Sequence, residues 1–227
     1  MKKITETLFA RSGVPVITAH SGCEGTPDNS IEHIKTAIAS GAEMLEIDIR
    51  EHDGTLYLTH DSGADYAACA TLAQCFELVA ETDDLCINCD VKTFGLTEKV
   101  CRLAAQYGME SRIVFTGSVG AEERKFLADS PADWWLSLWR SPWERKHFAE
   151  ACAEYASMND LYRIINLDYK MVHDALLDKT KENGYMLSVW TVNNEKDIRR
   201  MMKSGIINIT TRQPKLALAI RKELFGE

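Results

Sequence analysis

Residues 15–41 read PVITAHSGCEGTPDNSIEHIKTAIASG, an apolar run, a polar turn and an amphipathic stretch that stops at Gly41. The run PVITAH (15–20) has the composition of a β-strand, and the stretch SIEHIKTAIASG (30–41) has helical spacing after a capping serine. The segment therefore predicts one strand, loop and helix unit. An imidazole, His20, is expected where the strand ends.

The same alternation continues along the chain. Further strands are predicted at residues 44–50, 85–92, 112–117, 134–138, 163–167, 186–191 and 206–210. Helices are predicted at residues 71–81, 96–108, 121–129, 172–184, 195–205 and 214–225. Eight strand and helix units in 227 residues favour the α/β class, and a single (β/α)8 TIM barrel over an open sheet. The chain is expected to form one domain, residues 1–227.

One segment departs from the repeat. Asp53-Gly54 is a turn dipeptide between two extended runs, so residues 55–60 are predicted to fold back as a short hairpin arm on the second strand. Counting outward from the turn places His60 and Asp61 opposite Glu46. The arm therefore brings a second imidazole toward the strand ends.

Composition excludes several classes of function. A net charge of −8 without a block of basic residues argues against a general nucleic-acid binder and leaves room for a bound cation. No apolar run is long enough for a signal peptide or a spanning helix, which predicts a cytoplasmic protein without a stable membrane anchor. The seven cysteines are scattered without the paired C-x-x-C spacing of a zinc site or a small disulfide scaffold, so they are expected to be reduced and packed as small apolar side chains.

Polar side chains gather at the predicted carboxyl ends of the first strands, where the active sites of TIM barrels lie. Residues two apart on a strand face the same side, so Glu46 pairs with Asp48, and Asp90 with Lys92. Buried carboxylates repel each other, and a divalent cation relieves that repulsion. An all-oxygen set suits Mg²⁺ or Ca²⁺, although two nearby histidines leave zinc open. Lys92 suits an anionic substrate.

The ordered motifs resemble the glycerophosphodiester phosphodiesterase family over nearly the whole chain. They are His20 and Gly22, Pro27 and Asn29, Glu46 and Asp48, Asp53 and Gly54, His60 and Asp61, Asp90 and Lys92, and Trp190 to Asn193. The resemblance implies a barrel hydrolase that cleaves a small glycerol-linked phosphodiester into an alcohol and glycerol 3-phosphate. It implies acid/base catalysis by His20 and His60, one divalent cation on Glu46, Asp48 and Asp90, and substrate contacts from Lys92, Asn29 and Trp190.

The chain departs from that family in several places. Ser21 stands where the family has a phosphate-binding arginine, and Asp90 replaces a metal-binding glutamate. Arg212, just after the last strand, stands where an acidic residue is usual. The first and last strands of a closed barrel are neighbours, so we expect Arg212 to make the phosphate contact that Ser21 lacks.

Two other functions stay open at this point. One is a related lyase that stops at a cyclic phosphate, and the other is an inactive module that binds phosphate esters. The aromatic stretch WWLSLWRSPW (134–143) could line a wall for a lipid-like leaving group through Trp139 or Trp143. Packing of these aromatics in the core is the favoured interpretation.

Overall fold

A computed structural model describes residue 8 and residues 13–138 and 164–226. Its strands are β1 (Val16–Ala19), β2 (Met44–His52), β3 (Thr55–Leu58), β4 (Cys86–Val91), β5 (Ile113–Gly117), β6 (Asp133–Trp134), β7 (Leu136–Ser137), β8 (Ile164–Asp168), β9 (Met186–Trp190) and β10 (Asn208–Thr211). Trp139 and Trp143, considered above for a substrate wall, lie outside the described residues.

Helices follow the strands in the same order. They are α2 (Ile31–Ser40), α3 (Leu72–Ala80), α4 (Thr97–Gln106), α5 (Ala121–Ala128), α8 (Asp174–Glu182), α9 (Glu195–Lys203) and α10 (Pro214–Phe225), with short 3-10 turns at Cys23–Gly25, Tyr66–Ala68, Glu110–Arg112 and Tyr169–Met171. These bounds agree with the predicted helices to within a few residues. Among the described residues, no helix is both long and apolar enough to cross a bilayer.

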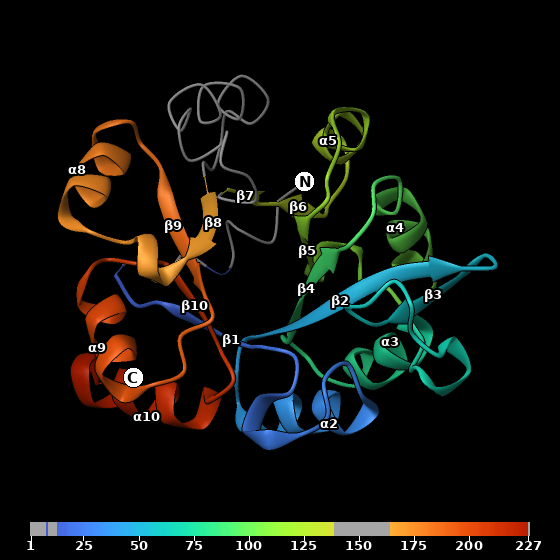
Figure 1. Ribbon diagram of the computed structural model, residues 1–227, viewed down its shortest axis with the longest axis horizontal. Coiled ribbons are helices and arrows are strands. Elements are labelled where there is room, and N and C mark those ends of the chain that lie inside the picture. Colours follow the sequence, from blue (N-terminus) through green and yellow to red (C-terminus); the bar gives the residue numbers. More distant parts are fainter. Residues whose placement is uncertain (1–7, 9–12, 139–163, 227) are drawn as a thin grey trace.

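The strands form one sheet in the order β6, β5, β4, β2, β1, β10, β9, β8, β7. Its two ends meet, because β6 pairs with β5, β7 pairs with β8, and only Trp135 separates β6 from β7. The predicted strand at 134–138 thus occurs as two short pieces that close the barrel. All pairings on this path are parallel, and helices surround the strands (Figure 1). The predicted TIM barrel is confirmed.

The predicted hairpin arm is also present. β3 runs antiparallel to β2, with Leu58 opposite Ile49, and the turn residues Asp53 and Gly54 both have positive φ. Two left-handed residues in succession are what a tight hairpin turn requires. Thr59 N then donates to Asp48 O at 3.0 Å, so the chain stays against β2 up to the residue before His60.

Alternate residues of the strands fill the barrel interior in layers. The lowest layer is apolar: Val16, Met44, Cys86, Val114, Trp135 and Ile164 form one buried cluster. Two positions further toward the carboxyl ends of the strands, the inward-facing residues are polar, among them Thr18, Glu46, Asn88 and Asn166. The interior therefore changes from apolar to polar toward the carboxyl ends of the strands, where the site lies.

Candidate active site

A cavity of about 640 Å³ opens at the carboxyl ends of the barrel strands. Its lining includes eight of the nine residues that the sequence analysis singled out: His20, Glu46, Asp48, His60, Asp90, Lys92, Trp190 and Arg212. They come from β2, β4 and β9 and from the residues that follow β1, β3, β4 and β10. The closed barrel therefore brings together side chains that lie far apart in the sequence, from His20 to Arg212.

The ninth residue, Asn29, does not line this cavity but lines a second one beside it. Its Nδ2 donates to Asp48 Oδ2 at 2.8 Å, and its Oδ1 accepts from Asp48 N at 2.9 Å. Asn29 N in turn donates to Ser21 Oγ at 2.8 Å, and Ser21 N donates to Glu46 Oε2 at 3.0 Å. The loop after β1 thus holds both carboxylates of β2 in place.

Glu46, Asp48 and Asp90 form a compact carboxylate cluster. Each offers an oxygen, and these oxygens lie within 4.8 Å of one another. Neighbouring strands β2 and β4 supply them, with Asp48 directly opposite Asp90 in the register. Asp90 Oδ1 is buried and has no hydrogen-bond partner among the described residues. Three oxygen donors with one orphaned buried oxygen fit a hard divalent cation.

Lys92 balances part of this negative charge. Its Nζ lies 2.6 Å from Asp48 Oδ1 and 2.5 Å from Asp90 Oδ2. Burial alone would raise the pKa of Asp48, but the Lys92 ammonium and the Asn29 amide outweigh it and lower that pKa. The balance is the opposite for Glu46: burial, then the charges of Asp48 and Asp90, raise its pKa well above the usual value and outweigh the hydrogen bond from Ser21 N and the charge of Lys92.

His20 is held in a defined tautomer. Its Nδ1 lies 2.8 Å from Ser21 O, and a carbonyl oxygen can only accept, so Nδ1 carries the proton. The other nitrogen, Nε2, lies 3.9 Å from Glu46 Oε2. Burial lowers the pKa of His20. The ring is therefore neutral near pH 7, with an unprotonated Nε2 on the cavity side.

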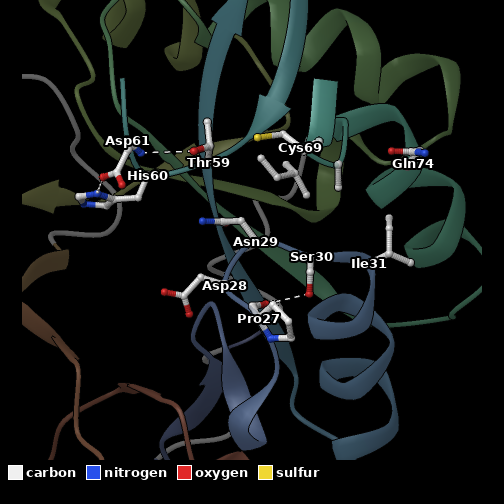
Figure 2. Close-up of a pocket in the computed structure, with 13 residues that line it drawn as sticks. Pro27, Asp28, Asn29, Ser30, Ile31, Thr59, His60, Asp61, Cys69 and Gln74 are labelled. Carbon is white, nitrogen blue, oxygen red and sulfur yellow. Dashed lines mark hydrogen bonds and ion pairs between the residues drawn. The ribbon is translucent and has the colours of Figure 1, made fainter. Parts of the chain in front are cut away.

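His60 stands at the rim and is far more exposed. Its Nδ1 lies 3.0 Å from Asp61 Oδ1, and its carbonyl oxygen accepts from Arg50 Nε at 2.9 Å. A second cavity of about 530 Å³ adjoins the first at His60 and Asp28, between the segments 27–31 and 58–74 (Figure 2). His60 thus separates two hollows at the barrel mouth.

Arg212 lies where the strand order predicts. β1 and β10 pair in parallel, and Arg212 Nη2 lies 3.0 Å from Asp28 Oδ2 across that rim. Ser21 itself is 1% exposed and is occupied by its bond to Asn29 N. The guanidinium therefore lines the cavity, whereas the Ser21 side chain does not.

Several lining residues were not singled out from the sequence. Arg50 follows Asp48 by two positions, so the alternation that identified Glu46 and Asp48 also reaches it. Asn88, Thr116, Ser137, Asn166 and Thr210 also line the cavity. Single polar residues within apolar strands carry no such motif, and only barrel closure brings them together.

No family model matches the chain. The sequence is 24% identical over 241 residues to a glycerophosphodiester phosphodiesterase of Caldanaerobacter subterraneus subsp. tengcongensis, covering 88% of this chain and 94% of that one.

Solved structures show a corresponding likeness in fold. A protein of Agrobacterium tumefaciens assigned as a glycerophosphoryl diester phosphodiesterase superposes with a TM-score of 0.80 at 19% identity, over 95% of this chain and 100% of that one. An Oleispira antarctica phosphodiesterase, solved with the product sn-glycerol-3-phosphate, gives a TM-score of 0.69 at 16% identity, over 96% and 99%. The chain thus resembles the glycerophosphodiester phosphodiesterases in sequence and shares their barrel fold.

Proposed function

We propose that this chain is a metal-dependent phosphodiesterase that hydrolyses glycerophosphodiesters to an alcohol and glycerol 3-phosphate. The observation that carries the proposal is the cluster of Glu46, Asp48 and Asp90 beside two histidines in one cavity. The names of the similar proteins supply the substrate class. We also propose that the chain forms one domain and is cytoplasmic. Free thiols fit a reducing compartment, and five of the six described free cysteines are buried.

A divalent cation, Mg²⁺ or Ca²⁺, would be held by Glu46, Asp48 and Asp90. When bound, it would neutralise charge on the phosphodiester and orient its nonbridging oxygens. Asn29 and Ser21 keep the carboxylates of β2 in position through their hydrogen bonds. Lys92, whose Nζ lies beside Asp48 and Asp90 in the cavity lining, would add a positive charge for the substrate phosphate.

The two histidines would exchange protons with the substrate. His20 Nε2 accepts the proton of the attacking glycerol hydroxyl, because Nδ1 is committed to Ser21 O. His60, held through Nδ1 by Asp61, donates from Nε2 to the leaving alcohol. The attacking oxygen forms a cyclic phosphate as the bond from phosphorus to the leaving alcohol breaks. Water then opens this ring with the proton transfers reversed. Each histidine supplies roughly 10²- to 10⁴-fold in rate.

Two further side chains would complete the substrate site. Arg212 is exposed enough to turn from Asp28 toward a phosphate oxygen, and a guanidinium binds such oxygens through two parallel N–H groups. Trp190 is 37% exposed at the end of β9 and presents a flat apolar surface to the cavity.

The test is release of glycerol 3-phosphate from glycerophosphoethanolamine, with and without a chelator. We expect turnover to fall at least a hundredfold with chelator and to return when Mg²⁺ or Ca²⁺ is added. Undiminished turnover in chelator would refute the metal-dependent mechanism. Running the reaction in heavy-oxygen water separates hydrolysis from a lyase reaction, because only hydrolysis incorporates the label. Absence of turnover with retained binding would indicate an inactive binding module.

A further inference from the structure

A row of polar side chains crosses the inside of the barrel below the cavity mouth. Ser137, Asn166, Ser188 and Asn208 are neighbours in the register of β7, β8, β9 and β10. Branched apolar residues usually fill this part of a TIM barrel, and a buried polar group is costly unless it is hydrogen-bonded. The row therefore needs an explanation beyond packing.

The hydrogen bonds along this row run in one direction. Thr18 Oγ1 donates to Asn208 Oδ1 at 2.7 Å, and Asn208 Nδ2 donates to Ser188 Oγ at 2.9 Å and Thr210 Oγ1 at 3.3 Å. Ser188 Oγ then donates to Asn166 Oδ1 at 2.8 Å. Ser188 Oγ accepts from Asn208 Nδ2, so the proton of the Ser188 hydroxyl is left to be donated to Asn166 Oδ1.

The row ends in donors that face the cavity. Asn166 is 6% exposed and lines the cavity, and its Nδ2 has no hydrogen-bond partner among the described residues. Next to it, Ser137 Oγ accepts from Gly117 N at 3.0 Å, which leaves the hydroxyl proton available. Ser137 also lines the cavity. An amide N–H and an O–H thus lie side by side on adjacent strands.

These donors are uncharged and lie on strands that do not pair with the strands of the carboxylate cluster. Glu46 and Asp48 are on β2, Asp90 is on β4 with Lys92 directly after it, and other strands separate β2 and β4 from β7 and β8 on both sides of the barrel. Charged groups suit a phosphate, whereas neutral donors with fixed directions suit neutral oxygen acceptors. A glycerol ester carries such acceptors in its hydroxyl groups.

We propose that Asn166 and Ser137 form a subsite that donates hydrogen bonds to hydroxyl oxygens of the substrate's glycerol part. The inference rests on the proposed function for the substrate class. The bonds from Thr18 through Asn208 and Ser188 fix the Asn166 amide before substrate arrives. Such preorganisation favours polyol esters over esters with an apolar chain of the same size.

The test compares binding of sn-glycerol 3-phosphate and n-propyl phosphate by calorimetry, because the two differ only in two hydroxyl groups. We expect the wild-type protein to bind the glycerol ester about tenfold more tightly or better, as for one or two neutral hydrogen bonds. Asn166→Leu should reduce this preference to within about twofold, through weaker binding of the glycerol ester. Asn166→Ala should give the same result if the leucine variant does not fold.

Thr180→Val is the matched control. It removes a hydrogen bond of a buried threonine on α8, from Thr180 Oγ1 to Leu177 O at 3.0 Å, outside both the polar row and the cavity lining, so stability should fall while the preference stays. An unchanged preference in the Asn166 variants, equal weakening of both ligands, or no preference in the wild type would overturn the subsite. Binding needs no turnover, so an inactive protein that keeps the preference would refute the proposed function and not the subsite.

Discussion

The two histidines have different surroundings but the same internal arrangement, with Nδ1 engaged and Nε2 directed away. We expect His20→Ala and His60→Ala each to lower turnover of a glycerophosphodiester at least a hundredfold, because each is assigned a proton transfer. His52→Ala is the control, since His52 stacks on Tyr66 and does not line the cavity. Near wild-type activity in either cavity variant would remove that histidine from the mechanism.

Gly117 supports Asp90 from the end of β5. It has φ of 83°, and a Cβ there would collide with Asp90 Oδ1 and Val91 O. Gly205 has φ of 72° with no atom near its Cβ position, so Gly205→Ala should cost only the left-handed backbone penalty, about 1–2 kcal/mol.

We expect Gly117→Ala to cost clearly more free energy of unfolding than Gly205→Ala, and also to weaken binding of divalent cations. Urea unfolding and calorimetric titration measure the two effects. Equal cost in both variants, with unchanged cation affinity, would mean that Asp90 is not positioned by Gly117.

Glu46 couples cation binding to stability. Its pKa is raised in the folded protein above the ordinary 4.5, so the metal-free fold loses stability as pH rises from that value through the folded pKa. Glu46→Gln should remove this loss, making the chelated protein more stable at pH 7 than the wild type. An amide is also a poorer ligand for a hard cation, so Mg²⁺ or Ca²⁺ affinity should fall.

Urea unfolding in chelator at pH 5 and pH 7, with parallel cation titration, checks both effects of Glu46→Gln. The stability difference between variant and wild type should widen at the higher pH. Unchanged affinity for both cations would make Glu46 a structural residue.

At the scale of the elements, the strand positions could be predicted from short apolar runs, and the arm from Asp53-Gly54. The pairing of carboxylates followed from the two-residue period of β2 and β4, which places Glu46 and Asp48 on one face. The break at Trp135 could not be predicted, because it depends on β5 and β8 pairing with different halves of one segment.

The polar row inside the barrel could not be predicted for the same reason. Asn166 and Thr18 are isolated polar residues in apolar strands, and they belong to one hydrogen-bonded chain only after β10 pairs with β1. Asn29 was expected to contact substrate, and that contact stays a prediction, while its side chain bonds to Asp48. Sequence motifs can identify candidate site residues, but the contacts between them depend on how the barrel closes.

The pairing of β1 with β10 places Arg212 at the cavity rim beside Asp28, where its predicted contact with phosphate can be tested. We expect Arg212→Ala to raise the Michaelis constant about tenfold or more, because one charge-assisted phosphate contact is lost. Arg212→Lys should recover part of the loss. The control is Arg102→Ala, which removes an exposed arginine that pairs with Glu98 on α4. Unchanged kinetics in Arg212→Ala would mean that this arginine serves only its ion pair with Asp28.

At the scale of the whole molecule, the two ends of the barrel do different work. The carboxyl end carries charged and polar side chains, and removing carboxylates and amides from water costs free energy that burying apolar groups does not. The opposite end is filled by the apolar cluster around Trp135, to which five strands contribute. The apolar end is therefore expected to supply stability that the mouth does not.

Trp135 tests this division, because it is 1% exposed and stands at the point where the barrel closes. Trp135→Ala should lower the free energy of unfolding by about 3–5 kcal/mol, the usual cost of a large cavity in a core. That is a large share of the total stability of a typical domain, about 5–15 kcal/mol. Trp135→Phe should cost less, because a ring still fills part of the space.

The layers between Trp135 and the cavity separate it from the substrate, so the Michaelis constant of the folded fraction should be unchanged in both variants. Urea unfolding and steady-state kinetics below the unfolding transition measure the two quantities. A small loss of stability, or a Michaelis constant that changes with it, would show that the two ends of the barrel are not separate in this way.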